Sequence, residues 1–183
     1  MGANAAIPDL LTGQPKGLVP DEWMQEGLDA TDAREICRVV PTAVAAVAAL
    51  TSGEPTLMLL SSFTAGVSFD PPMCSIAVQR SSSTWPMIED LPALGISLLG
   101  TEHQDKIEQL GSRFRGSRLD GIEWVARPSG AVLLKHAPLW IEAKVMHKYP
   151  AGDHLIVVMK MQNYRMVDNA ASIFGQEGAY RAL

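Results

Sequence analysis

The chain has 183 residues, of which 47% are hydrophobic and 19% are charged, and its formal net charge is −5. This length suits one domain with a sizeable core, and this composition excludes a disordered or fibrous chain. The negative charge, without any run of lysine or arginine, argues against nucleic acid or an anionic membrane as the main partner.

Residues 1–28 are rich in glycine and proline, and we expect them to form an irregular N-terminal arm. They lack the basic segment followed by an apolar run that marks a secretory signal. No apolar stretch in the chain is long enough to span a bilayer. We therefore expect a cytoplasmic protein with no membrane partner.

A helix is predicted after the arm, because Asp29 and Thr31 are both good N-cap residues and Pro41 ends the helical pattern. Two apolar runs follow, at residues 43–50 and 56–62. The turn residues between them predict a β-hairpin.

The segment Ser61–Trp85 reads as a strand end, a rigid turn, a second strand and the start of a helix. Asp70-Pro71-Pro72 fixes the turn, because each proline sets its own φ and lacks an amide hydrogen. Residues 73–78 have the length and apolar character of a buried strand. A short helix is then predicted over about residues 85–90, with Pro86 in its first turn.

Further along, residues 94–99 predict a short buried strand. Thr101 and Gln104 have the spacing of a capping box, which predicts a helix with Ile107, Leu110 and Phe114 on one face.

The C-terminal third is dominated by short β segments. Residues 141–145 alternate strictly between apolar and polar, which predicts one buried and one solvated face. Residues 155–161 are nearly all apolar and predict a central strand. Strands outnumber helices, so we expect a mainly β fold, a barrel with a few peripheral helices, formed by one domain over residues 29–183.

Two hydroxyl clusters stand out as candidate binding segments. Ser61, Ser62 and Thr64 surround Phe63 at a strand end, and Ser81–Thr84 precede a predicted helix. Hydroxyls and free amides at a helix start can bind phosphate. Taken alone, the first cluster is better interpreted as the polar end of a strand, and the second could be only a helix cap.

These segments resemble the flavin reductase-like family, whose domain is an FMN-binding split β-barrel. The resemblance rests on S-S-F-T followed by D-P-P, an apolar strand and R-S-S-S-T. Pro41-Thr42-Ala43-Val44 upstream and Pro150-Ala151-Gly152-Asp153-His154 downstream match as well. Four pieces in the expected order cover roughly residues 30–183.

The resemblance implies that the first cluster lines the isoalloxazine ring and the second holds the flavin phosphate. It also implies that His154 faces the flavin and orients the nicotinamide without transferring a proton, whereas read alone it is a loop histidine. We expect His154 to be the catalytic residue. The expected cofactor-binding residues are Thr42, Ser61, Ser62, Phe63, Thr64, Gln79, Ser81, Ser82, Ser83, Thr84, Phe114, Gly152 and His154.

The function implied is that of a flavin reductase, in which NADH or NADPH reduces FMN or FAD and the reduced flavin leaves to supply a partner oxygenase. The resemblance also implies a homodimer with the flavin near its two-fold interface. Two alternatives remain: a protein of the same fold that keeps its flavin as an oxidase or electron carrier, and a non-catalytic module that binds flavin or another planar ligand.

No motif for another site is written in the chain. The four histidines lack the spacing of a zinc site, and neither a P-loop nor a Rossmann glycine pattern occurs. We therefore expect no metal. Arg113, Arg115 and Arg118 form the one basic cluster, which we interpret as a solvated helix end and loop, with an anion contact as the alternative.

Overall fold

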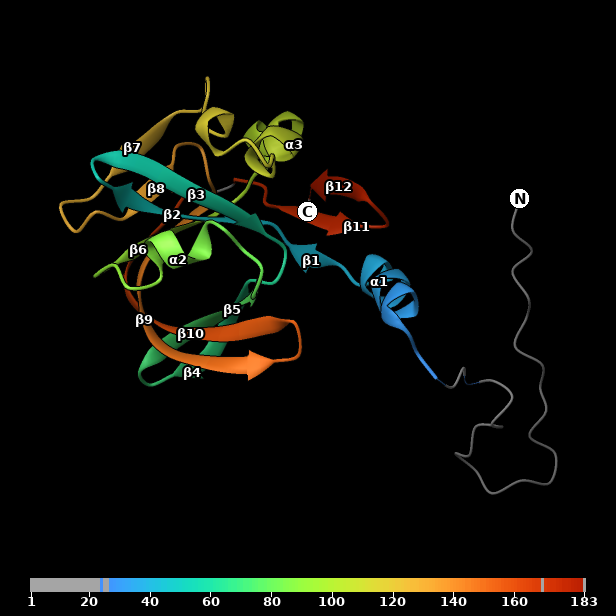
Figure 1. Ribbon diagram of the computed structural model, residues 1–183. Helices are drawn as coiled ribbons and strands as arrows, with labels where there is room; N and C mark the ends of the chain where they lie inside the picture. Colours follow the sequence, from blue (N-terminus) through green and yellow to red (C-terminus); the bar gives the residue numbers. More distant parts are fainter. Residues whose placement is uncertain (1–23, 25–26, 169, 183) are drawn as a thin grey trace. The chain divides into compact units, whose positions relative to one another are not determined.

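The structure is a computed structural model that describes Met24, residues 27–168 and residues 170–182 (Figure 1). It divides into two compact units, Met1–Cys37 and Arg38–Leu183. The predicted arm lies largely outside the described residues, and the expected domain boundary after residue 28 stays a prediction. Within the described chain, no helix is both long enough and apolar enough to cross a membrane.

Helix α1 spans Ala30–Val39 and begins where the sequence predicts. The Asp29 carboxylate accepts hydrogen bonds from the backbone N–H groups of Thr31 and Asp32, at 2.6 and 3.0 Å. These bonds satisfy two of the amides that a helix start leaves without partners. Asp29 is therefore the N-cap.

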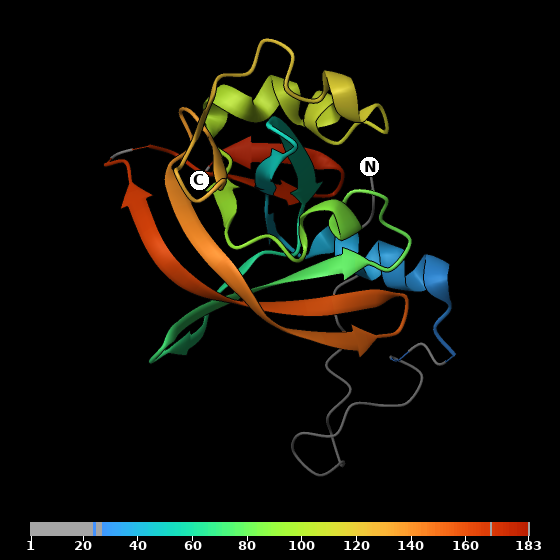
Figure 2. The ribbon, with the colours of Figure 1, turned by 60° about the vertical axis from the view of Figure 1, so that its left-hand side comes forward.

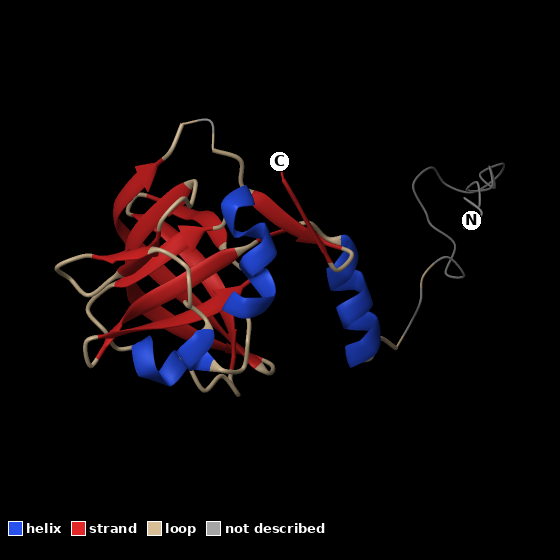
Figure 3. Ribbon diagram, turned by 90° about the horizontal axis from the view of Figure 1, so that it is seen from above, coloured by secondary structure: helices blue, strands red, loops and turns tan. Residues whose placement is uncertain are grey.

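Most of the regular structure is β, as expected (Figures 1 and 3). The strands are β1 Thr42–Ala43, β2 Ala45–Thr51, β3 Glu54–Leu60, β4 Thr64–Phe69, β5 Pro72–Gln79, β6 Leu94–Leu98, β7 Trp124–Ala126, β8 Val132–Leu134, β9 Leu139–Ala151, β10 His154–Met166, β11 Ile173–Gln176 and β12 Ala179–Ala182. The short helices are α2 Trp85–Ile88, the 3₁₀ segment Thr101–Lys106, α3 Ile107–Leu110 and the 3₁₀ turn Arg115–Ser117.

The main sheet has seven antiparallel strands in the order β3-β2-β6-β9-β10-β5-β4. Although four strands separate β3 from β5 in this order, the two are in contact. The sheet therefore curls onto itself, with β9 and β10 as its long curved hairpin (Figure 2). Because β3 and β4 are the edges and do not pair, the barrel is open on one side. The mainly β fold is confirmed.

Two apolar layers stabilise this sheet. Inside the curl, alternate residues of β2 such as Val47 pack with Ile76, Ile96 and Val157. The opposite face of β2 packs against β8 and α3 in a second cluster. One strand serves both layers because successive side chains point to opposite faces. The second layer needs a glycine, since a Cβ on Gly95 would lie 1.9 Å from the carbonyl oxygen of Val132.

Several local predictions are confirmed. β2 and β3 form the expected hairpin, and its turn residues Ser52 and Gly53 both have positive φ, at 53° and 88°. This is the geometry of the two-residue turns that match strand twist. β10 pairs with β9 on one side and β5 on the other, so it is central as predicted.

Two local predictions are wrong. The amide of Gly100 is capped by His103 Nδ1, not by a Thr101–Gln104 box, and the segment opens as a 3₁₀ helix. Phe114 lies beyond α3 and is 80% exposed, so it does not share the buried face of Ile107 and Leu110. The Thr101 amide, which the expected box would cap, instead donates to the Ala171 carbonyl at 3.4 Å.

The predicted alternation of residues 141–145 holds for Ile141, Ala143 and Lys144 and fails at Glu142. Glu142 belongs to the face expected to be wet, yet it is only 7% exposed. The β7–β8 hairpin lies against this part of the barrel, and Arg127, next to β7, forms an ion pair with the Glu142 carboxylate at 3.1 Å. The sequence pattern alone cannot reveal that a distant hairpin covers the second face.

Candidate functional site

A cavity of about 700 Å³ lies where the open barrel separates, between the ends of β3 and β5. Four further segments complete it: Ser61 and Ser62 after β3, the stretch 81–84 before α2, the loop after α3, and the first residue of β10. These segments are distant in sequence, and the curl of the sheet brings them together. The volume is in the range of small-molecule sites.

Ser62 ties the two sides of the opening together. Its hydroxyl donates to the carbonyl oxygen of Ala77 at 2.8 Å and accepts from the Ala77 amide at 2.9 Å. A single side chain thus replaces a backbone ladder between the end of β3 and β5. The Ser62 hydroxyl is largely committed to this bridge, whereas Ser61 is exposed beside it.

The serine run before α2 divides into two kinds of residue. Ser82 Oγ accepts from the backbone amides of Thr84 and Trp85, at 3.3 and 3.1 Å, and so caps the start of α2. Ser81 and Ser83 are exposed, and their hydroxyls have no partner among the described residues. The cap interpretation is confirmed for Ser82, and a phosphate contact of Ser81 and Ser83 stays a prediction.

Arg118 extends this polar end of the cavity. Its Nε donates to the Ser112 carbonyl at 2.6 Å, and its Nη1 donates to the Leu57 carbonyl and, at 3.2 Å, to Thr84 Oγ1. Burial, and secondarily the charge of Arg115, lowers the pKa of the Arg118 guanidinium. The three hydrogen bonds hold the Arg118 side chain in one place beside the hydroxyl run.

Arg113 also lines the cavity, and no hydrogen bond or ion pair engages its side chain within the described part of the chain. Arg115 lies outside the lining but donates to the Ser83 carbonyl at 3.0 Å. Arg113 and Arg115 are exposed, as expected for a solvated cluster, whereas Arg118 is half-buried, and an anion contact stays a prediction. In the sequence, the only indication that arginines reach the cavity is the group of three arginines that follows a predicted helix.

His154 lines the cavity as well. It begins β10 directly opposite Gln79 of β5, and both residues line the space. The Arg80 amide donates to the Asp153 carbonyl at 2.9 Å, which fixes the hairpin turn against β5. His154 Nδ1 lies 2.7 Å from an Asp153 carboxylate oxygen. This contact leaves Nε2 as the ring nitrogen available to a ligand.

The structure brings together eight of the predicted cofactor-binding residues. They are Ser61, Ser62, Gln79, Ser81, Ser82, Ser83, Thr84 and His154. Five others lie outside the cavity lining: Thr42, Phe63, Thr64, Phe114 and Gly152. Their contact with a flavin stays a prediction.

The positions of four of those residues have local explanations. Thr42 lies in β1, where its hydroxyl donates to the Gly175 carbonyl at 3.5 Å. Phe63 packs against the inner core. Thr64 is exposed at the start of β4, and Gly152 occupies the β9–β10 turn with φ of 60°.

The cavity joins three kinds of surface. Its polar lining comprises hydroxyls, two guanidinium groups, Gln79 and His154, and Met58, Leu60 and Val78 supply apolar wall. Such an arrangement suits a flat, partly apolar molecule that carries an anionic group at one end.

A family model described as "Flavin reductase like domain" matches residues 37–183. Among curated proteins, the actinorhodin polyketide dimerase of Streptomyces coelicolor is 29% identical over 82% of this chain and 84% of its own. The NADH:FMN oxidoreductase of Rhodococcus qingshengii is 29% identical over 86% of this chain and 83% of its own.

Solved structures share the fold. The flavin reductase component of a bacterial two-component tryptophan halogenase superposes with a TM-score of 0.76 at 26% identity, covering 85% of this chain and 98% of its own. A Streptomyces globisporus NADH:FAD oxidoreductase, in complex with NAD and FAD fragments, gives a TM-score of 0.78 at 24% identity, covering 91% and 96%.

Proposed function

The chain belongs to the flavin reductase-like domain family, and on that premise we propose that it is an NAD(P)H:flavin oxidoreductase acting on FMN or FAD. The observation that supports this most is the cavity at the barrel opening. It combines free hydroxyls and guanidinium groups with a histidine and an apolar wall. Reduced flavin then leaves to supply a partner oxygenase, as in two-component monooxygenases.

The residues present fit a flavin phosphate. Ser81, Ser83 and Arg113 reach the cavity without partners among the described residues, so their donors are available to an anion. Arg118 and Thr84 are already joined beside them. Guanidinium and hydroxyl donors form strong charge-assisted bonds with phosphate. These residues would hold the phosphate, and the apolar wall would contact the ring.

His154 and Gln79 would orient the nicotinamide. Bound flavin supplies the acceptor for a hydride, so the protein needs to provide alignment rather than a proton donor. The Asp153 contact and the Arg80–Asp153 backbone bond hold the histidine in place for this task. His154 is accordingly assigned to orientation.

A steady-state assay that crosses NADH and NADPH with FMN, FAD and riboflavin tests the proposal. We expect flavin-dependent oxidation of at least one dinucleotide. Ser83→Asp tests the phosphate contact, because a carboxylate facing the phosphate should suppress turnover with FMN. Turnover with riboflavin, which lacks the phosphate, is the control and should be spared. If no combination exceeds the rate in buffer, the reductase assignment is wrong.

A second candidate keeps the fold but retains its flavin and acts as an oxidase or electron carrier. It is favoured by the similarity to a protein named as a polyketide dimerase, which is not a reductase name. A yellow protein that keeps FMN through gel filtration would support this candidate. Colourless protein that turns over added flavin would support the exchanging reductase.

We also propose that the protein forms a homodimer. Large apolar side chains are exposed on β4 and β9, including Phe69 at 88% and Tyr149 at 54%. Symmetric dimers are the commonest soluble oligomers and would cover such surface. Light scattering at micromolar concentration is expected to give twice the chain mass, and a monomer would contradict the proposal.

A further inference from the structure

A second cavity, of about 430 Å³, opens between the β7–β8 hairpin and the strands β9 and β10. It shares none of its lining residues with the first cavity. His154 begins β10 and Arg165 lies near its end, so roughly 35 Å of extended chain separates the two sites along this strand. None of the residues expected to bind flavin lies here.

Two cross-strand pairs form the floor of this cavity. Glu142 of β9 lies opposite Asn163 of β10, and Trp140 lies opposite Arg165. The Trp140 indole N–H donates to the Leu134 carbonyl at 2.6 Å, which fixes the ring. The Arg165 guanidinium carbon lies 4.8 Å from the centre of that ring. Stacking of this kind holds the planar cation in a defined orientation.

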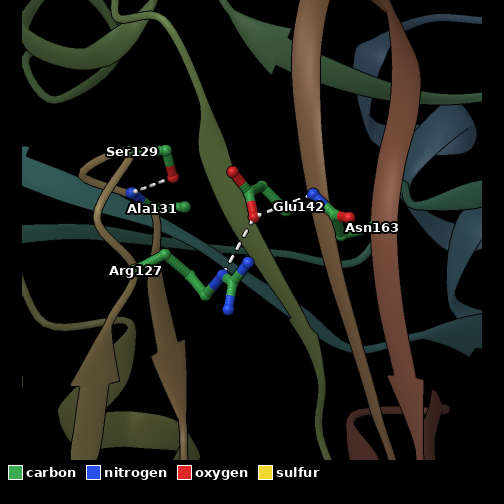
Figure 4. Close-up of polar contacts among 5 residues, drawn as sticks. All are labelled: Arg127, Ser129, Ala131, Glu142 and Asn163. Carbon is green, nitrogen blue, oxygen red and sulfur yellow. Dashed lines mark hydrogen bonds and ion pairs between the residues drawn. The ribbon is translucent and has the colours of Figure 1, made fainter.

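Glu142 is the buried anchor of the site. One of its carboxylate oxygens accepts from Arg127 Nε at 3.1 Å and from Asn163 Nδ2 at 3.2 Å (Figure 4). The Ser129 hydroxyl and then the Arg127 guanidinium hold the pKa of this carboxyl below its usual range. Glu142 therefore remains charged. Because its carboxylate accepts the bond from Arg127 Nε, it holds the Arg127 side chain in place.

The remaining donors face the cavity. Arg127 is engaged only through Nε among the described residues, which leaves both terminal nitrogens. Arg165 has its cation–π contact but no hydrogen bond or ion pair within the described chain. Two cations and one carboxylate leave this lining with a net positive charge. Val125, Leu133 and Trp140 add apolar surface.

We propose that this cavity is a binding site for a small aromatic carboxylate, distinct from the cavity beside His154. A stacked guanidinium presents parallel N–H groups that match the two oxygens of a carboxylate. The apolar side chains of Val125 and Leu133 suit an aromatic ring, and the volume admits a one- or two-ring molecule. The carboxylate meets Arg127 and Arg165, and the ring lies against the wall from β7 and β8.

The test is calorimetric titration of the full chain, saturated with FMN, with 2-naphthoate and with its neutral amide. We expect saturable binding of naphthoate and roughly ten- to a hundred-fold weaker binding of the amide, because a charge-assisted bond is lost. Arg165→Met should weaken naphthoate binding by a similar factor. Lys160→Met, an exposed cation on the same strand but outside the cavity, is the matched control and should change nothing.

Equal affinity for naphthoate and its amide would overturn the proposal, as would an undiminished affinity in Arg165→Met. Absence of any binding to the folded wild type would overturn it as well. Competition between naphthoate and FMN would assign the ligand to the first cavity and equally refute a second site. Arg165→Gln, which keeps a polar side chain, replaces Arg165→Met if thermal melting shows that the latter does not fold.

Discussion

His154 Nδ1 and Asp153 Oδ1 lie 2.7 Å apart at the turn that joins β9 to β10. The two residues are adjacent in sequence, and the turn is held to β5 through the bond between the Arg80 amide and the Asp153 carbonyl. An imidazole whose Nδ1 faces a carboxylate presents Nε2 in a fixed direction. The contact therefore defines which nitrogen faces the cavity.

We expect His154→Ala to raise the apparent KM for the dinucleotide or to lower kcat, while FMN affinity stays close to that of the wild type. Asp153→Ala should shift the same parameters less, because the ring remains but its orientation loosens. Steady-state kinetics and an FMN titration of each variant give the comparison. A change confined to the thermal melting temperature would show that His154 is only a structural turn residue.

Ser82 and Ser83 should separate capping from ligand binding. Ser82→Ala removes the acceptor for the amides of Thr84 and Trp85 and should lower the free energy of unfolding by about 1 kcal/mol. Ser83→Ala should leave stability unchanged and weaken FMN by roughly ten- to a hundred-fold, with riboflavin unaffected. Denaturant unfolding and flavin titrations measure the two effects.

Equal loss of FMN and riboflavin in Ser83→Ala would indicate general damage rather than a lost phosphate contact. If neither ligand is affected, the phosphate must lie elsewhere in the cavity.

The buried His103 should make stability depend on pH. Burial is the main cause that lowers the pKa of His103 below its ordinary value of 6.5. The unfolded chain therefore binds the proton more readily, so this contribution is fully present above about pH 6.5 and is lost as pH falls toward the lower folded pKa. Protonation would also remove the acceptor of the Gly100 amide.

Urea unfolding of the wild type and of His103→Asn between pH 8 and pH 5 tests this. The variant should be less stable at pH 8 and should lose less stability on acidification. Parallel curves for the two proteins would rule out His103 as the source of the dependence.

Gly95 is expected to tolerate no side chain. The added Cβ of Gly95→Ala would meet backbone atoms of Val132, which cannot move without displacing β8. Overpacking typically costs about 1–3 kcal/mol, and a backbone obstacle belongs at the upper end. Gly116→Ala is the matched control, since nothing lies within 4 Å of its added Cβ. Similar melting temperatures for both variants would contradict the close approach of β6 and β8.

The local elements were predictable from residues alone. The β2–β3 hairpin, β5 and the central strand β10 follow from apolar runs bounded by turn residues. These patterns depend only on residues a few positions apart in the sequence. The predicted strands therefore form in any fold that buries the apolar runs. The Asp29 cap is local in the same sense.

The hydroxyl run illustrates an intermediate case. Its position before α2 marked it as either a cap or a phosphate site, but the pattern could not assign a role to each serine. Only the folded chain shows that Ser82 faces the helix amides while Ser81 and Ser83 face the cavity.

Only the tertiary structure shows how segments distant in sequence contribute to the two cavities. Arg118 reaches Thr84 because the loop after α3 returns over the end of β3, and Glu142 is buried because a hairpin from residues 124–134 covers the face that its alternation marked as wet. These contacts depend on how a curled sheet brings separated strands together. Side-chain periodicity records which residues share a face of a strand, but it carries no information on which distant segment covers that face.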